Sequence, residues 1–277
     1  MNQIKILYIG NKLVKHGATP TTIDTFGQKL EQCGYTVFYA SSVKNKALRL
    51  LDMIVKFFYY VPKINCVFID TYSTSNFYYS LIISQLCRVF NMKYITLLHG
   101  GNLPKRLQKN KVLSQMIFKN AYKNVSPSQF LFKKFVVYFP QNTIYIPNAI
   151  TIEDYNFLNK KFDVPKLLWV RSFSKIYNPI MAIKVFEVVK KQFPNATLCM
   201  VGPDKDGSLN QCKSLVKEKK LSVLFTGKLS KNEWIALSKE YNVFINTTHF
   251  DNMPVSVIEA MALGLPVVST NVGGIPY

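Results

Sequence analysis

The sequence lacks the long apolar run and the leader that mark membrane-spanning and exported proteins. A spanning helix needs about 20 apolar residues, whereas the candidate Leu50–Val61 is short and is interrupted by Asp52 and Lys56. The apolar run at the amino terminus ends at Gly10 without a signal-peptide cleavage region. No segment is dominated by Gly and Ser, by Pro or by polar residues, so no disordered region is expected. These absences predict a folded cytoplasmic protein that is soluble or peripheral to the membrane.

Cysteine is present, but without the pattern of a disulfide framework or a metal site. The sequence contains no Cys-x-x-Cys pair and no grouping of cysteine with histidine. Such a scatter is typical of reduced thiols that serve as small core residues in a cytosolic protein. We therefore expect no metal ion and no cofactor. The five cysteines are Cys33, Cys66, Cys87, Cys199 and Cys212.

Acidic residues are few, and the formal net charge is +20 from 35 basic and 15 acidic side chains. Basic and aromatic residues alternate over residues 44–63 and again over 105–135, where Arg49 is one of the cations of the first stretch. Surfaces of this kind bind nucleic acids or anionic membranes. A solvated basic face above core aromatics explains the same pattern without any ligand.

Apolar runs alternate with segments of helical period along the first half of the chain. Strands separated by helices predict a parallel sheet with right-handed crossovers. The expected strands are 4–9, 36–39, 66–69, 94–98, 123–125 and 143–146, and the expected helices are 21–33, 44–60, 77–90 and 107–122.

The same alternation restarts after a polar segment with two prolines, residues 147–165. At about 150 residues per domain, 277 residues predict two domains, which we place at 1–155 and 156–277. The expected strands are then 167–170, 196–201, 223–226, 243–246 and 266–269, with helices at 179–193, 209–219, 231–241 and 255–263.

This order predicts two doubly wound α/β domains. Ligands of such sheets bind beyond the carboxyl ends of the strands, so we expect a site in the cleft between the two domains. The sequence stops at Tyr277, directly after a strand and a Gly-Gly turn. A bare sheet edge there would expose unpaired backbone, so we expect the second domain to be incomplete and the sequence to be a fragment.

The segment from Asp251 to Gly274 combines a loop, a helix and a strand in a pattern that suits ligand binding. Pro254 fits the first turn of the helix, and backbone N–H groups at a helix start favour an anion or sugar oxygens. Glu259 stands among apolar residues of this helix, where a carboxylate is costly to bury without a partner. An exposed glutamate on the solvent side is the alternative.

Two cations precede a second predicted helix. Arg171 follows a strand, Lys175 comes four residues later, and the helix starts near Asn178–Pro179. Cations that converge on a helix start can bind a diphosphate, although a surface pair is common in so basic a chain. Asp204-Lys205-Asp206 has the spacing of a metal-binding D-x-D motif, but its context indicates a turn and a helix cap.

Residues 251–274 closely resemble the carboxyl-terminal motif of retaining glycosyltransferases with the GT-B fold, the glycosyltransferase family 4 type or glycosyl transferases group 1. In that motif two acids are separated by seven residues, as Asp251 and Glu259 are, before Gly-x-Pro-Val-Val and a Gly-Gly turn. The resemblance implies that Glu259 binds the donor ribose, and that Asp251 and the loop of Asn252, Met253 and Pro254 hold the transferred sugar. This loop departs from the commoner Gly-Phe-Gly, which leaves the donor sugar open.

The same resemblance implies roles for residues elsewhere. Arg171 and Lys175 would bind the diphosphate and stabilise it as the leaving group. Gly202, Lys228 and Leu229 would surround the nucleotide, His99 would contact a sugar hydroxyl, and Gly17 would lie in a loop that faces the substrates. Relatives of this type need no metal, because basic residues and a helix dipole carry the phosphate charge.

The resemblance therefore implies transfer of a hexose-type sugar, with retention, from a nucleoside diphosphate to an acceptor hydroxyl. The resemblance implies a lipid-linked or surface glycan as the acceptor, as in polysaccharide biosynthesis, and an anionic membrane surface as a peripheral partner on its cytoplasmic face. A basic nucleic-acid-binding protein and a GT-B epimerase or hydrolase of sugar nucleotides are the alternatives. A Rossmann oxidoreductase is disfavoured, because no Gly-x-Gly-x-x-Gly follows the first strand.

Overall fold

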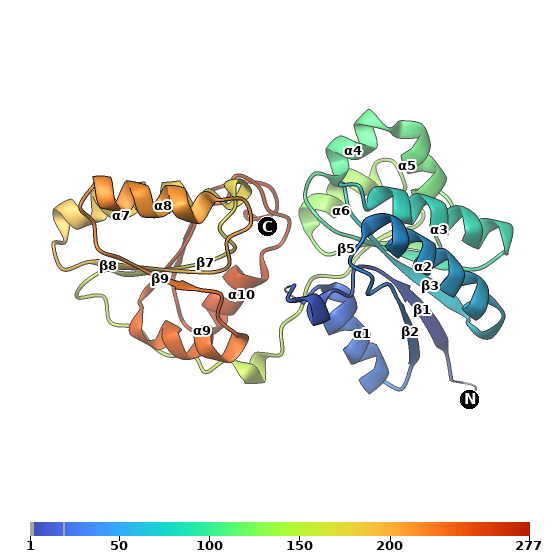
Figure 1. Cartoon of the computed structure of the whole chain (residues 1–277), viewed down its shortest axis with the longest axis horizontal. Coiled ribbons are helices and arrows are strands. Elements are labelled where there is room, and N and C mark those ends of the chain that lie inside the picture. The colour runs from blue at the N-terminus through green and yellow to red at the C-terminus, as the bar shows by residue number, and fades with distance from the viewer. Residues whose placement is uncertain (1–2, 19) are drawn as a thin grey trace. The chain divides into compact units, whose positions relative to one another are not determined.

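The computed structural model describes residues 3–18 and 20–277, which form two compact units that divide between Pro147 and Asn148. Each unit is an α/β structure built on one parallel sheet, of six strands in the first and five in the second (Figure 1). The fold class predicted from the sequence is thereby confirmed. Residues 148–155, expected at the end of the first domain, belong to the second unit.

The first sheet has the strand order β2-β1-β3-β4-β5-β6. The chain moves outward in one direction from β1 to β2 and in the other from β3 onward. The carboxyl ends of β1 and β3 therefore flank the topological switch point, where ligands of doubly wound sheets bind. The strands are β1 (Lys5–Ile9), β2 (Thr36–Ala40), β3 (Cys66–Thr71), β4 (Tyr94–Leu98), β5 (Lys123–Ser126) and β6 (Thr143–Tyr145).

Helices cover both faces of the first sheet. Ile23 of α1 packs with Tyr8 on one face, while Met53 of α2 and Ile83 of α3 pack with Leu7 on the other. The helices of this unit are α1 (Thr22–Gln32), α2 (Lys46–Tyr60), α3 (Phe77–Val89), α4 (Leu103–Lys109), α5 (Lys111–Phe118) and α6 (Gln129–Val136).

One helix prediction in this unit was wrong, and one helix was missed. The helix expected over residues 107–122 is two helices, because Asn110 leaves the helical conformation with φ −124° and ψ 57° between α4 and α5. Helix α6 was not predicted. It begins where the Ser128 side chain accepts a hydrogen bond from the Leu131 amide, and it buries Leu131 and Phe135.

The second sheet has the order β11-β10-β7-β8-β9, with its switch point between β7 and β10. Its strands are β7 (Lys166–Val170), β8 (Thr197–Val201), β9 (Val223–Gly227), β10 (Val243–Asn246) and β11 (Val267–Ser269). All of the neighbouring pairs are parallel, so their carboxyl ends lie along one edge of the sheet.

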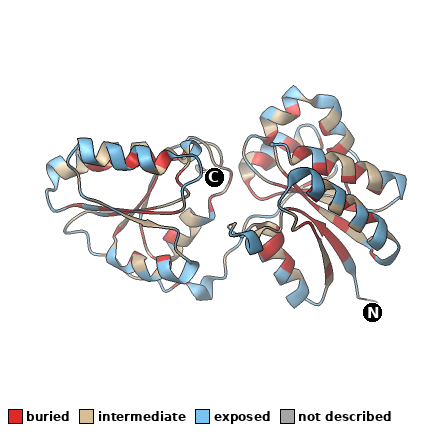
Figure 2. Cartoon of the chain, in the orientation of Figure 1, coloured by how far each residue is buried: buried red, intermediate tan, exposed pale blue. Residues whose placement is uncertain are grey.

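This sheet lies between two pairs of helices (Figure 1). Helices α7 (Pro179–Gln192) and α8 (Ser208–Glu218) pack on one face, and α9 (Lys231–Leu237) and α10 (Val255–Ala262) on the other. Buried strand residues separate the two layers (Figure 2). Helix α9 ends at Leu237, before a 3-10 turn over Ser238–Glu240, and Pro254 caps α10 from outside its first turn.

No helix within residues 3–18 and 20–277 combines the length and the hydrophobicity that crossing a bilayer requires.

Candidate functional site

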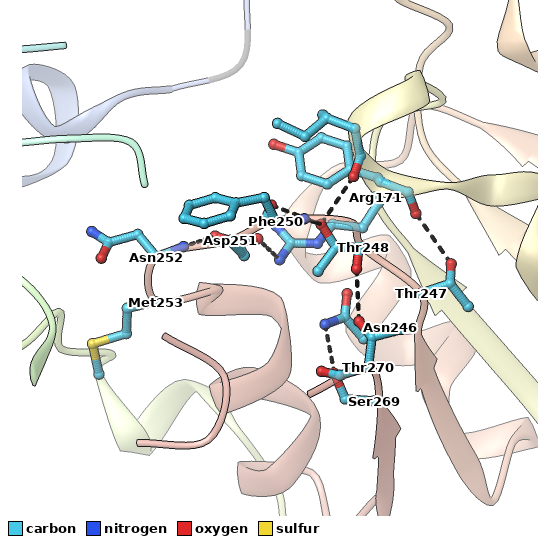
Figure 3. Close-up of polar contacts among 12 residues, drawn as sticks. Arg171, Asn246, Thr247, Thr248, Phe250, Asp251, Asn252, Met253, Ser269 and Thr270 are labelled. Atoms are coloured by element: carbon cyan, nitrogen blue, oxygen red, sulfur yellow. Dashed lines mark hydrogen bonds and ion pairs between the residues drawn. The ribbon is translucent and has the colours of Figure 1, made fainter. Parts of the chain in front are cut away.

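Two loops meet at the switch point of the second unit. The loop after β7 carries Arg171, and the loop after β10 carries Asp251. The Arg171 guanidinium donates from Nη2 to Oδ2 of Asp251, which forms an ion pair whose side chains are 14% and 17% exposed (Figure 3). The sequence placed both residues in the site but did not predict that they pair with each other.

The Arg171 guanidinium keeps one donor without a partner. Its plane lies over the Tyr177 ring, 4.8 Å from the ring centre, and this contact fixes its orientation. Its Nε is buried and has no hydrogen-bond acceptor among the described residues. An unpaired buried donor costs about 1–3 kcal/mol, and a guanidinium binds two oxygens of one anion well. An anion that reached this donor would supply the missing acceptor.

Threonine hydroxyls hold the loop after β10 in place (Figure 3). Thr247 donates to the Asn178 carbonyl at 2.9 Å, and this contact ties the two loops together. Thr248 donates to the Phe250 carbonyl at 2.8 Å, and Thr270 donates to the Thr248 carbonyl at 2.7 Å. These threonines were not predicted from the sequence. The polar run directly after an apolar strand was the available signal.

The predicted sugar-binding loop is built on close backbone contacts. The Asp251 carboxylate accepts from the Asn252 amide at 2.7 Å, and the Asp251 carbonyl accepts from the Gly274 amide at 2.9 Å. A Cβ on Gly274 would overlap the Asn252 carbonyl, so only glycine fits there. Asn252 is buried, Met253 is half-buried and Pro254 is buried at the start of α10.

Glu259 on α10 has a partner that the sequence did not predict. Its half-buried carboxylate accepts a hydrogen bond of 2.5 Å from the Tyr155 hydroxyl, and burial raises the pKa of Glu259. Tyr155 lies in the segment before β7, and the Lys231 ammonium lies 4.8 Å from the centre of its ring. The hydrogen bond offsets the cost of placing a carboxylate among apolar neighbours.

The remaining predicted residues of this unit lie around the same edge of the sheet. Gly202 follows β8 with φ +148°, and a Cβ there would overlap the Arg171 carbonyl. Lys175 and Lys228 are exposed, and Leu229 packs into the core that contains Trp234. The Lys175 ammonium has no hydrogen-bond or ion-pair partner in the part of the chain that the structure describes.

The aspartates of the D-x-D segment accept hydrogen bonds at the start of α8. Asp204 accepts from the Gly207 amide at 3.0 Å, and Asp206 accepts from the Lys175 amide at 2.9 Å and from the Ser208 amide at 3.3 Å. Over residues 3–18 and 20–277, no group of three or more His, Cys, Asp and Glu side chains is arranged to hold a metal ion.

Two predicted residues lie in the first unit. His99 follows β4, and its Nε2 lies 2.8 Å from Oδ1 of Asp70 on β3. Gly17 is exposed and closes the 3-10 turn Val14–His16 with φ 79°. Asp70 was not predicted, although a carboxylate near the end of a buried strand was a visible signal.

Comparisons with known proteins match part of the second unit to a family model and nearly the whole chain to known structures. Residues 152–277 match the family described as Glycosyl transferases group 1. An uncharacterised glycosyltransferase of Methanocaldococcus jannaschii is 36% identical over 92 residues, which are 32% of this chain and 21% of that protein. The chain thus spans about a fifth of the length of this curated relative.

Two solved structures cover nearly all of the chain. Sucrose-phosphate synthase from Thermosynechococcus elongatus aligns with a TM-score of 0.79 at 18% identity, over 99% of this chain and 82% of that one. The Anabaena protein HepE, solved in complex with UDP and glucose, aligns with a TM-score of 0.74 at 15% identity over the same shares. The chain therefore has the GT-B fold, and its residues 152–277 match the glycosyl transferases group 1 family.

Proposed function

We propose that the protein transfers a sugar from a nucleoside diphosphate donor to an acceptor hydroxyl. The observation that carries this proposal is the Arg171–Asp251 pair at the switch point, together with the guanidinium donor that has no acceptor among the described residues. The match of residues 152–277 to the group 1 family supports it. So does the neighbour HepE, which was solved with UDP and glucose.

The proposed roles follow the positions of the side chains. Arg171 and Lys175 neutralise the diphosphate as it leaves, since charge builds up there in the transition state. Asp251 and the loop of residues 252–254 hold the sugar, and Glu259 accepts from the ribose hydroxyls. Gly202, Lys228 and Leu229 surround the base. We further propose a hexose donor, retention of configuration and no metal or other cofactor, as in the family 4 type.

The first test is nucleotide binding. UDP, GDP and ADP are added separately to the full chain and to Glu259→Gln, and melting is followed by thermal shift. One diphosphate is expected to raise the Tm of the wild type, since a ligand that binds only the folded state stabilises it. The rise should be smaller in the variant, because the glutamine amide is a weaker acceptor for two hydroxyls than a carboxylate.

The outcomes separate the competing functions. A cooperative melt that no diphosphate shifts would reject the transferase. Oligonucleotide binding with a steep salt dependence, in place of nucleotide binding, would favour a nucleic-acid-binding protein. Release of free sugar, or conversion of the donor to an epimer without any acceptor, would favour the GT-B hydrolase or epimerase.

We also propose that the protein binds the membrane surface peripherally and acts on a lipid-linked acceptor. Helix α2 supports this proposal. Five large apolar side chains form one face of this helix and are exposed. Lysines flank the face at both ends, and the Lys63 ammonium lies 3.9 Å from the centre of the Tyr59 ring. An apolar face with cations beside it suits an anionic bilayer surface. We call Leu48, Leu51, Val55, Phe58 and Tyr59 the α2 stripe.

The membrane proposal predicts that Val55→Asp weakens binding to vesicles of anionic phospholipid about tenfold, from lost apolar burial and added negative charge. Co-sedimentation at low salt measures this. Val188→Asp, on an exposed position of α7, is the matched control and should bind like the wild type. Equal binding of both variants, or no binding of the wild type to anionic vesicles, would reject the α2 stripe as a membrane surface.

A further inference from the structure

The switch point of the first unit contains a buried carboxylate with an unusual set of neighbours. Asp70 lies near the carboxyl end of β3, and its side chain is 0% exposed. Its Oδ1 accepts from the Tyr8 hydroxyl at 3.0 Å and lies 2.8 Å from Nε2 of His99. Its Oδ2 is buried and has no hydrogen-bond partner among the described residues.

Among the described residues, His99 is the nitrogen-bearing side chain that contacts this carboxylate. No Lys or Arg in residues 3–18 and 20–277 forms an ion pair with Asp70. A buried carboxylate is unfavourable unless it is paired. Gly10 directly follows β1 and has no side chain to collide with Oδ2 of Asp70. A Cβ on Gly10 would lie 2.5 Å from that oxygen.

This arrangement selects one form of the imidazole. A carboxylate only accepts hydrogen bonds, so Nε2 of His99 carries the hydrogen and donates it to Asp70. The Tyr72 ring stacks on the imidazole, with 4.9 Å between centres and 28° between planes, which holds its orientation. In the neutral ring Nδ1 is then an acceptor, and it has no hydrogen-bond partner in the described part of the chain.

We propose that Asp70 is a positioning residue, which fixes His99 in the Nε2–H form and presents Nδ1 as a hydrogen-bond acceptor for a hydroxyl of the donor sugar. This inference rests on the proposed function, since it assigns His99 to the sugar half of that donor. Asp70 acts through His99, and Tyr8 supports Asp70 by the second bond to Oδ1.

The tautomer is measurable without any substrate. The sequence has three histidines, so the imidazole nitrogens can be resolved by ¹⁵N NMR of the full chain, with His99→Gln to assign the signal. We expect Nε2–H with an unprotonated Nδ1 in the wild type, and loss of this single form in Asp70→Leu. Tyr8→Phe, which keeps the carboxylate, should retain it. An Nδ1–H form in the wild type would overturn the proposal.

The functional effect is measured as the affinity gained from the sugar. UDP is compared with UDP-glucose, GDP with GDP-mannose and ADP with ADP-glucose. The readout is the affinity for the nucleotide sugar divided by the affinity for the bare diphosphate, within the pair that binds. Asp70→Asn, Asp70→Leu and His99→Gln should each lower this ratio about 10-fold, with the affinity for the bare diphosphate unchanged. The double variant His99→Gln/Asp70→Leu should lose no more than His99→Gln alone.

The results separate the two proposals. A ratio lowered in His99→Gln and unchanged in both Asp70 variants would overturn positioning by Asp70 and leave the transferase intact. A further loss in the double variant would also overturn it, since Asp70 would then act independently of His99. Absence of nucleotide binding in the wild type would reject the proposed function, while the NMR result still decides whether Asp70 fixes the tautomer.

Discussion

Arg171→Met is expected to weaken nucleoside diphosphate binding about 100-fold, whereas Asp251→Asn should strengthen it. The methionine removes the guanidinium charge and its charge-assisted hydrogen bond to phosphate, worth roughly 1.5–3 kcal/mol. The asparagine keeps the shape of Asp251 but removes the carboxylate that competes with phosphate for the Arg171 guanidinium.

Calorimetric titration of the diphosphate selected by thermal shift checks both directions. Lys184→Met, on an exposed position of α7, is the matched control, because it removes one positive charge from the same unit away from the switch point. If Arg171→Met and Lys184→Met bind the nucleotide equally well, the phosphate role of Arg171 is wrong. If Asp251→Asn weakens binding, the ion pair assists the anion and does not compete with it.

Gly202→Ala is expected to destabilise the protein by about 4 kcal/mol or more, which lowers the Tm by roughly 10 °C. The residue has φ +148°, and its new methyl group would overlap the Arg171 carbonyl, which belongs to the neighbouring backbone and cannot rotate away. The Gly202 amide also donates to the Gly227 carbonyl at 2.8 Å, so a shift of this loop disturbs the edge of the sheet.

Gly207→Ala separates the two causes of this effect. Gly207 has φ +84°, but a Cβ there would have no atom within 4 Å, so the substitution brings backbone strain without overlap. Its cost should be about 1 kcal/mol. Calorimetric melts of the two variants measure the difference, and equal losses of Tm would show that the approach of Gly202 to Arg171 is not the cause.

Much of the fold could be predicted because apolar periodicity and turn residues are local signals. The bounds of β4 and β10 match the expected strands, and the others differ by a few residues. The break at Asn110 has no glycine or proline to mark it, and α6 mixes aromatic and basic residues in a way that looks like a surface patch. These two elements depend on tertiary packing, which outweighs local preference.

The site was predictable as two separate motifs, and its assembly was not. Arg171 and Asp251 are 80 positions apart, and Tyr155 and Glu259 are 104 apart, so no local pattern links them. Arg49 shows the opposite error. It was predicted to belong to a basic surface, but it is buried and donates to Asn11 and to backbone carbonyls.

The hydrogen bond between Tyr155 and Glu259 has a consequence for how the proposed donor would be selected. The Tyr155 hydroxyl already bonds Oε1 of Glu259, so a ribose hydroxyl that takes its place would gain only the difference between its own hydrogen bond and the one that it displaces. Recognition at Oε1 of Glu259 is then an exchange of hydroxyl groups. This exchange penalises a deoxyribose, which would displace the tyrosine and form one hydrogen bond fewer than a ribose.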